Sequence, residues 1–394
     1  MNYRSMTLAI FVATTMASSH AITLWEATDA ILNRNGDRML TELNREAKNA
    51  ETLGMANAPD PQIEGDYMVA PAGEDNRWGV GISYELEWPG AYGARRNLAK
   101  AMRNANSAEA DAALLTKRLE ILNEIEAYLY ADSRLSVMQN VMSTSDSIRT
   151  IAERAARGGE LSRLDLSKIA IEQSRVQSMI SNIEAEKLAI AGNLKTLNGG
   201  MDCKALLDQI DKTFRPTPLA PLDRYLASAK NNPELAKAMS EYQVAERNVS
   251  VAKAERLPNF SIGYAHEFED GMHFNGASIG VSVPLFASRH KVKAAEAAKA
   301  AAEYQMTVST DVLESDINSL YVEIQTLDKA LATPANVFST TDYPTLLLKA
   351  YDGGELSLTD YLSELSWFYE AHLDFIDLQY QREQKANRLS LLCR

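Results

Sequence analysis

Several features are scarce in this sequence, and each scarcity excludes a class of protein. Only two cysteines, Cys203 and Cys393, occur in 394 residues, so a disulfide scaffold cannot carry the fold. Lysine and arginine do not cluster and the net charge is −13, which argues against a nucleic-acid surface. Beyond the first residues, no apolar run approaches the ~20 residues of a membrane-spanning helix. The hydrophobic share of 46% is nevertheless enough for a large buried core.

The sequence also lacks the motifs of catalysis. Its five histidines are scattered without the spacing of metal ligands: His20, His266, His273, His290 and His372. The pattern G-x-S-x-G at 276–280 needs a sharp strand-to-helix turn at Ser278, but a strand pattern runs straight through it. No glycine-rich phosphate loop is present. We therefore expect no enzyme, no metal site and no cofactor.

The first residues have the pattern of an export signal. Arg4 supplies positive charge, an apolar stretch follows at 6–17, and Ser19-His20-Ala21 resembles a cleavage site. The sequence predicts a signal peptide at 1–21, with a buried N-terminal helix as the alternative. The mature chain then lies outside the cytoplasm, where a disulfide between Cys203 and Cys393 is permitted. Two unpaired small hydrophobic residues are the alternative to that disulfide.

The chain repeats itself at a nearly constant offset. The stretch "RGGELSRLDL" (157–166) returns as "DGGELSLTDY" (352–361), and "NRNGDRML" (33–40) lies over "KNNPELAK" (230–237). The offset stays between 195 and 199 residues throughout. We interpret the chain as a tandem duplication of 22–200 and 222–394, joined by a linker at 201–221 that ends in prolines. In each half the sequence predicts a first helix (24–55 and 222–256), then two strands, a very long helix, a Gly-Gly turn and a last helix.

Four segments alternate apolar and polar residues with a period of two, which predicts strands. The alternation is strict at 78–88, 259–268 and 277–285, and weaker at 62–69. A soluble sandwich could cover the apolar face. The length of the strands and the small or acidic residues opposite favour lipid instead. Four strands cannot close a barrel and lipid tolerates no open edge, so a membrane location requires several copies of the chain.

The helices are too long for an ordinary globular domain. No glycine or proline occurs at 94–157, and one helix over that stretch would reach about 96 Å. Leu115, Leu122 and Leu129 recur at a spacing of seven, as in a coiled coil. In the second half, 287–333 is equally uninterrupted, and Pro334 and Pro344 predict a bend or short break after it.

The last helices, 160–198 and 355–392, are expected to fold back after the Gly-Gly turns. Glycine suits the left-handed conformation that ends a helix. Ser162 and Ser357 are placed to cap the helices that follow, with Asp165 and Asp360 at the third position. Asp replaces the Glu or Gln that is usual in a capping box. A well-made helical hairpin, copied by duplication, is a sufficient structural explanation of this motif.

The duplicated pattern resembles the TolC family of outer-membrane efflux channels. The resemblance covers almost the entire mature chain and is carried by 231–264, 276–298 and 346–364. The stretch "EWPGAYGARR" (87–96) is also similar to the branch that includes heavy-metal efflux channels. The resemblance implies a mixed, mostly α fold. Long coiled-coil helical hairpins would form a periplasmic tunnel, and four transmembrane strands per protomer would contribute to a twelve-stranded trimeric β-barrel.

In this family the hairpin tips dock a periplasmic adaptor protein, which links to an inner-membrane pump, here expected to be of the resistance-nodulation-division type. The matching tip residues are Gly158, Gly159, Glu160, Leu161, Ser162 and Asp165, then Gly353, Gly354, Glu355, Leu356, Ser357 and Asp360. The resemblance places Tyr351, Asp360 and Glu364 at the tunnel entrance as a gate. Leu356 stands where the family has a basic residue, and Ser363 where it has a second acid, so we expect this gate to be held differently.

We therefore expect a homotrimer in the lipid of the cell outer membrane, with its helical tunnel in the periplasm. It would act as the passive exit duct of a tripartite efflux system that exports drugs or metal ions. An outer-membrane duct of a type I protein secretion system is the alternative with the same fold. A soluble coiled-coil scaffold is a third hypothesis, but it leaves the apolar strand faces unexplained.

Overall fold

The computed structural model describes residues 22–69, 71, 76–159, 161–211, 216–284, 290–340 and 342–393. The predicted signal peptide, Glu160, residues 212–215 of the predicted linker and the end of the predicted fourth strand lie outside this part. The chain forms two compact units, Met1–Asn35 with Ile121–Arg215, and Gly36–Glu120 with Pro216–Arg394. Across the described residues, no helix combines the length and the apolar character needed to cross a membrane.

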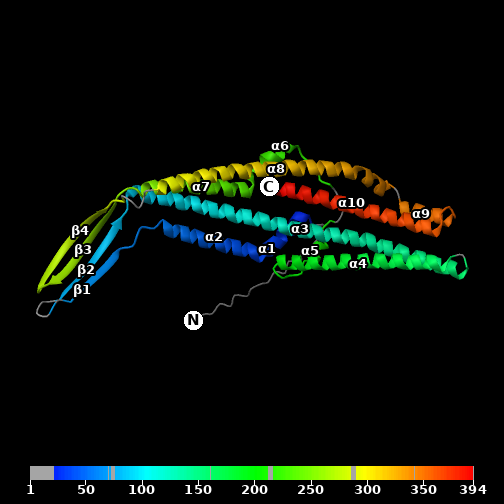
Figure 1. Ribbon diagram of the computed structural model, residues 1–394, viewed down its shortest axis with the longest axis horizontal. Helices are drawn as coiled ribbons and strands as arrows, with labels where there is room; N and C mark the ends of the chain where they lie inside the picture. The colour runs from blue at the N-terminus through cyan, green and yellow to red at the C-terminus, as the bar shows by residue number, and fades with distance from the viewer. Residues whose placement is uncertain are drawn as a thin grey trace, which may run out of the picture. The chain divides into compact units, whose positions relative to one another are not determined.

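Both halves of the chain have the order of elements that the sequence repeat predicts (Figure 1). The first half runs α1 (Leu24–Arg34), α2 (Gly36–Met55), β1 (Gln62–Met68), β2 (Arg77–Leu86), α3 (Pro89–Arg157) and α4 (Arg163–Leu197). A short helix, α5 (Lys204–Leu207), follows. The second half runs α6 (Leu222–Ser228), the 3-10 helix η1 (Ala229–Asn231), α7 (Pro233–Ala254), β3 (Asn259–Glu269), β4 (Met272–Ser282), α8 (Lys291–Thr340), α9 (Tyr343–Asp352) and α10 (Leu358–Leu392).

The first helix of each half is interrupted at an asparagine, where the sequence predicted one continuous helix. Asn35 separates α1 from α2, and Asn232 separates η1 from α7. Both are buried in extended backbone, with ψ of 132° and 131°. The Asn35 amide donates to the carbonyl of Leu197 at 2.8 Å, and the Asn232 amide to that of Leu392 at 2.9 Å. Each amide thus satisfies a carbonyl at the end of the last helix of its own half, which otherwise lacks a helical partner.

In the first unit, α4 packs against the part of α3 that follows Ile121. Residues of α4 at alternating spacings of four and three are buried, as in a coiled-coil seam: Ile169, Gln173, Val176, Ile180 and Ile183. The polar member of this seam, Gln173, donates to Asp146 Oδ1 of α3 at 3.0 Å. The predicted linker also packs into this unit, because Leu207 and Ile210 are buried and Ile22 forms a bridge with Ile210.

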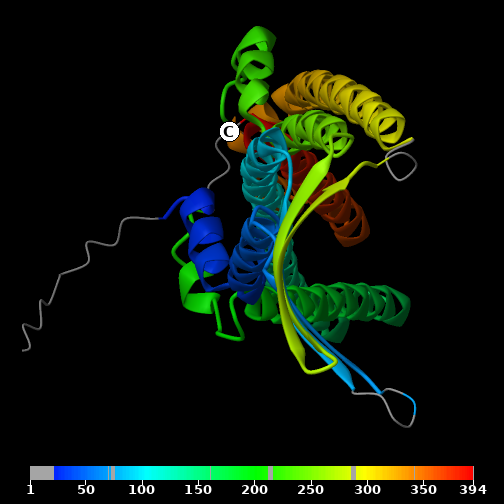
Figure 2. The same ribbon diagram turned by 90° about the vertical axis from the view of Figure 1, so that its left-hand side faces the viewer.

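The second unit contains a four-stranded antiparallel sheet in the order β1-β2-β3-β4. Figure 2 shows these strands as one curved sheet. The two-residue turn at Asp270 and Gly271 joins β3 to β4 with positive φ at both residues, 49° and 76°. This is the conformation of a type I′ turn, which Asp-Gly favours and which matches the twist of the strands. β1 and β4 each pair on one side only, so both edges of the sheet are open.

The helices of the second unit pack through small and aliphatic side chains. Val249 and Ala252 of α7 meet Ala295 of α8, and short side chains allow the two helices to approach closely. Farther along α8, Ile317 and Ile324 pack with Leu389 of α10. Figure 1 shows α7 lying along α8 and the sheet extending from their shared end.

The break predicted near Pro334 and Pro344 exists, but it does not lie at Pro334. α8 continues through Pro334, and the next helix, α9, begins at Tyr343 after the cap residue Asp342. Pro344 stands in the first turn of α9, where the missing N–H removes no helical hydrogen bond. Ring contacts on the C-terminal side of Pro334 hold α8 in place, because Phe338 stacks on Phe375 at 5.0 Å between ring centroids.

Candidate functional site

The tip between α9 and α10 is built as the sequence predicts. Gly354 has φ of 77° and its N–H donates to the Tyr351 carbonyl, while the Glu355 N–H donates to the Ala350 carbonyl, both at 2.9 Å. These two bonds form a Schellman motif, which closes a helix with glycine in the left-handed conformation. Gly353, Gly354, Glu355 and Ser357 are exposed, and Leu356 is half-buried.

The tip between α3 and α4 has the same glycine conformation in the residues that the structure describes. Gly159 has φ of 81°, and its N–H donates to the Ala156 carbonyl at 3.1 Å. Gly158 and Ser162 are exposed, whereas Leu161 is half-buried. Because only glycine adopts this φ without strain, the two Gly-Gly turns are a backbone requirement of both hairpins.

A matched serine–aspartate pair begins the helix after each tip. The Asp165 N–H donates to Ser162 Oγ at 3.2 Å, and Ser162 Oγ donates in turn to Asp165 Oδ2 at 2.6 Å. The corresponding distances at Ser357 and Asp360 are 3.1 and 2.6 Å. The predicted helix caps are therefore confirmed at both tips. The aspartate accepts the serine hydroxyl rather than the cap backbone, because its side chain is one carbon shorter than that of the usual glutamate.

The hydroxyl of Ser162 also acts on the ionisation of its partner. This hydrogen bond is the main reason why the pKa of Asp165 lies below its ordinary value, and the nearby Lys168 lowers it further. The tip therefore keeps a carboxylate that remains charged at a lower pH than an isolated aspartate. A negative charge at the first turn of α4 is also favoured by the helix dipole.

The three predicted gate residues each have a different partner within the chain. Tyr351 contacts the ring of Tyr361, with 5.3 Å between centroids, and Asp360 accepts from Ser357. Glu364 accepts the hydroxyl of Tyr343 at 2.9 Å. The gate function of these residues stays a prediction.

Two tyrosines outside the predicted gate support this region. Tyr361 is 2% exposed, and burial raises the pKa of its hydroxyl. The hydrogen bond to Glu364 raises the pKa of Tyr343. In the sequence, aromatic residues are enriched around 343–375. Hydrophobic periodicity alone assigns such residues to an ordinary helix core.

The sheet has one apolar face that is exposed in the single chain. The registers place Ile82 beside Tyr264, and Ile262 beside Ile279, on that face. Ile279 is 82% exposed and Ile82 is 49% exposed. On the opposite face, the Arg77 guanidinium lies 2.7 Å from a carboxylate oxygen of Glu267 and 3.6 Å from one of Glu269. Glycines on this polar face, such as Gly263, lie against the serine side chains of the neighbouring strand.

An ion pair recurs at equivalent positions of the two helical hairpins. In the first unit Lys187 of α4 pairs with Asp132 of α3. In the second unit Arg382 of α10 pairs with Asp328 of α8 at 2.9 Å. The Arg382 guanidinium also donates to Glu383 at 2.8 Å and to the Thr217 carbonyl at 2.7 Å. Arg382 is 1% exposed, so these partners compensate for removing the charge from water.

Both cysteines are free thiols in the structure. They belong to different units, and a disulfide between them stays a prediction. Cys203 is buried in the first unit, and Cys393 is half-buried in the second. Burial raises the pKa of both thiols, that of Cys393 to about 11. A raised pKa keeps each thiol in its neutral form at ordinary pH.

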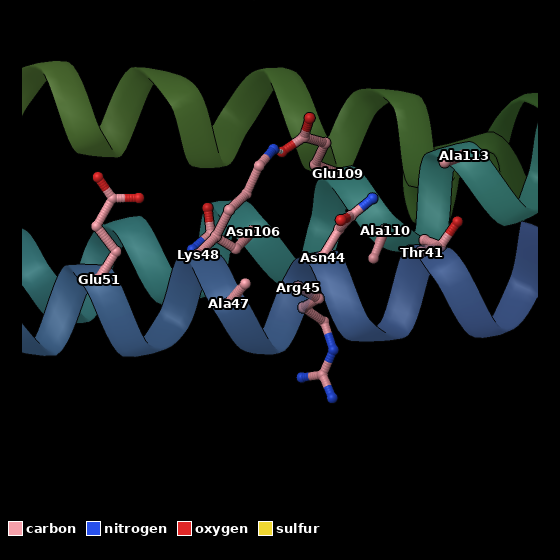
Figure 3. A pocket seen from close by; sticks show the side chains of 10 residues that line it. All are labelled: Thr41, Asn44, Arg45, Ala47, Lys48, Glu51, Asn106, Glu109, Ala110 and Ala113. Carbon is pink, nitrogen blue, oxygen red and sulfur yellow. Dashed lines mark hydrogen bonds and ion pairs between the residues drawn. The ribbon is translucent and has the colours of Figure 1, made fainter.

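A groove of about 340 Å³ lies between α2 and α3 in the second unit (Figure 3). Its lining residues are Thr41, Asn44, Arg45, Ala47, Lys48, Glu51, Asn106, Glu109, Ala110 and Ala113. Figure 3 shows Lys48 reaching toward Glu109, and their charged atoms lie 2.6 Å apart. The Asn106 amide donates to Asn49 at 3.0 Å. These contacts join the two helices, so we interpret the groove as part of their packing.

Comparison with known proteins shows what this architecture is similar to. Residues 226–393 match the family model described as outer membrane efflux protein. No curated protein sequence matches the chain. A membrane protein from Pseudomonas aeruginosa has a TM-score of 0.78 at 18% identity, with 94% of this chain and 93% of that chain covered.

Two outer membrane channels have the same fold. The open state of MtrE from Neisseria gonorrhoeae has a TM-score of 0.75 at 17% identity, with 100% of this chain and 97% of that chain covered. CmeC from Campylobacter jejuni also has a TM-score of 0.75 at 17% identity, with 94% of this chain and 85% of that chain covered. The resemblance to outer-membrane efflux channels is confirmed, as is the predicted mostly α fold with long helical hairpins and four strands. Residues 226–393 thus belong to the outer membrane efflux protein family, and the chain as a whole has the fold of outer-membrane channels.

Proposed function

We propose that the protein is the trimeric outer-membrane duct of a tripartite efflux system. The observation that carries the proposal is the sheet of the second unit. One of its faces exposes large apolar side chains, and within the described residues its edge strands β1 and β4 have no partner on their outer sides. Lipid is the cover that suits the apolar face, and closure with further copies is the arrangement that leaves no open edge in lipid.

Three copies would supply twelve strands, within the range of membrane barrels. The polar face, with its glycines, serines and acidic residues, would then line a water-filled lumen. The helical hairpins would continue the duct into the periplasm, and α3 alone has 69 residues, about 100 Å at the rise of an α-helix. The duct would be passive, without catalysis of its own.

The exposed tips support docking of a periplasmic adaptor. Both tips present a rigid glycine turn, a half-buried leucine and a capped carboxylate. A partner could recognise this pattern twice per chain, at six sites in a trimer. The adaptor would connect the duct to an inner-membrane pump that supplies drugs or metal ions.

Cysteine cross-linking between sheet edges tests the assembly. Both native cysteines are first replaced by serine, and single cysteines are then introduced in pairs, one on β1 and one on β4. In a closed trimer, one register of pairs should give disulfide-linked dimers and trimers in membranes. Intramolecular products only, together with a monomeric mass in detergent, would contradict the proposal.

The cargo requires a separate experiment. Deleting the gene should raise susceptibility to drugs or metal ions and increase their accumulation in cells, and the wild-type gene should reverse both effects. Retention of a secreted protein in the deletion strain, with unchanged susceptibility, would favour a type I secretion duct instead.

A further inference from the structure

Two histidines that are seven residues apart in the sequence meet at the outer end of the β3–β4 hairpin. His266 lies on β3 and His273 on β4, near the turn that is remote from α7 and α8 (Figure 1). We propose that these two imidazoles bind a divalent transition-metal ion of the zinc, copper or nickel class. The proposal goes beyond the efflux function, because binding at this point requires neither transport nor an adaptor.

The turn is what brings the two side chains together. The two-residue loop at Asp270 and Gly271 fixes the register so that Phe268 faces His273, and His266 faces Asn275. Residues two apart on a strand share a face, so His266 and His273 are diagonal neighbours on the same face. Spacing rules for metal ligands on one helix or one loop do not detect this pair.

The distance between the nitrogens suits a shared ion. His266 Nε2 and His273 Nδ1 lie 3.3 Å apart. Two nitrogens on one tetrahedral zinc, each at about 2.0–2.1 Å, are separated by about 3.3–3.4 Å. The two rings are stacked with 27° between their planes. A turn of the His273 ring about its Cβ–Cγ bond would direct its lone pair to an ion held by His266.

A polar group behind the pair orients the ring of His266. His266 Nδ1 lies 2.8 Å from Asn275 Oδ1, which also accepts the hydroxyl of Tyr264 at 2.8 Å. Because that oxygen is an acceptor, it favours the tautomer of His266 in which Nδ1 carries the proton and Nε2 keeps its lone pair. Metal-bound histidines are commonly held in this way, with the second nitrogen donating to a fixed oxygen.

The rings lie on the apolar face of the sheet, but beside the turn, where the proposed membrane strands would end and meet water. Neighbouring aromatic rings restrict them. Trp78 lies 5.6 Å from His266 and Phe268 lies 5.0 Å from His273, measured between ring centroids. His273 is exposed and His266 half-exposed. The nearby carboxylates of Glu267 and Glu269 interact with Arg77 on the other face. The ion would therefore have two imidazole ligands, with water completing its coordination, and imidazole suits zinc, copper and nickel.

Copper binding to the full mature chain tests the proposal. The protein is purified in detergent without a histidine tag, and Cu²⁺ is added at one equivalent per chain. Electron paramagnetic resonance should show two imidazole nitrogens on the ion, and calorimetry with Zn²⁺ should show one site per chain. His266→Gln and His273→Gln should each weaken zinc binding by about tenfold or more, and Asn275→Leu by about tenfold because it removes the orienting oxygen.

His290→Gln is the matched control, because it removes an exposed histidine outside the pair. It should leave binding unchanged. Equal zinc affinity in the wild type and in the double variant of His266 and His273 would overturn the proposal. The wild-type copper spectrum decides the question even where a variant fails to fold, because a signal from one imidazole or none contradicts a two-histidine site.

Discussion

At the scale of single residues, the hairpin tips combine backbone chemistry with charge. Ser162 both caps α4 and donates to Asp165, so one hydroxyl fixes the start of the helix and the ionisation of the carboxylate. Ser357 and Asp360 make the same two hydrogen bonds, so helix capping alone is enough to explain the serine and the aspartate of the motif. A docking role for the tips therefore has to be tested with changes that leave these caps intact.

The pKa of Asp165 should depend on the Ser162 hydroxyl. Because the folded-state pKa is lowered, the carboxylate stabilises the start of α4 at pH values above its unfolded pKa. This contribution is lost as the pH falls through the lowered folded-state pKa. Ser162→Ala should raise the pKa of Asp165 toward its ordinary value, measured by carboxyl carbon NMR with labelled aspartate. Ser162→Thr keeps a hydroxyl and should preserve the lowered pKa, and an unchanged pKa in the alanine variant would show that Lys168 dominates.

Arg382 is the residue whose removal should affect the second unit most. Arg382→Met leaves the Thr217 carbonyl and Asp328 without their buried donor. We expect a loss of about 2–4 kcal/mol in the free energy of unfolding, because one member of a buried ion pair is removed. The matched change Lys187→Met in the first unit should cost less, since Lys187 is 22% exposed and water replaces part of its interaction. Denaturant unfolding in detergent compares the two, and equal losses would contradict this ranking.

At the scale of elements, the Gly-Gly turns set the geometry of the tips. Gly354→Val places a β-branched side chain at φ of 77° and should destabilise the tip locally by about 1–3 kcal/mol. Gly353→Ala is the control, because Gly353 has φ of −74° in the ordinary helical region. Hydrogen exchange of the first turn of α10 should accelerate in the valine variant and change little in the control.

The same pair of variants tests whether the tip contributes to transport. In the proposed efflux system, Gly354→Val should impair resistance while trimers still form in the membrane. Gly353→Ala should retain resistance. Full resistance in the valine variant, at wild-type protein levels, would argue against docking through this tip.

Elements with a clear period could be predicted from the sequence, and elements set by tertiary contacts could not. Strict alternation located β2 and β3 to within two residues at their ends. Asn35 and Asn232 looked like ordinary helical positions, because their partners are carbonyls more than 150 residues away. Pro334 looked like a helix break, but packing around Phe338 outweighs its cost. The histidine pair was missed because only the register of the hairpin brings it together.

At the scale of the whole molecule, the two halves of the chain carry hairpins that are similar but not identical. Arg163 in the first tip corresponds to Leu358 in the second, and Leu166 corresponds to Tyr361. Leu358 and Tyr361 are buried, whereas Arg163 is exposed. In the proposed trimer these differences would create two kinds of docking groove that alternate around one mouth. An adaptor that distinguishes them could bind in a fixed rotational register.

The two faces of the sheet give the most direct test of the proposed membrane location. Ile279 lies on the apolar face and is 82% exposed, whereas its neighbour Ser278 points to the polar face. A charge that faces lipid near the middle of a membrane strand costs about 2–4 kcal/mol, and a charge in a wet lumen costs little. Ile279→Arg should therefore reduce the amount of heat-stable trimer in outer-membrane fractions, and Ser278→Arg should leave it near the wild-type level. If the polar face were instead packed in a soluble core, Ser278→Arg would be the more damaging change, and that reversed order would rule out a lipid-facing sheet.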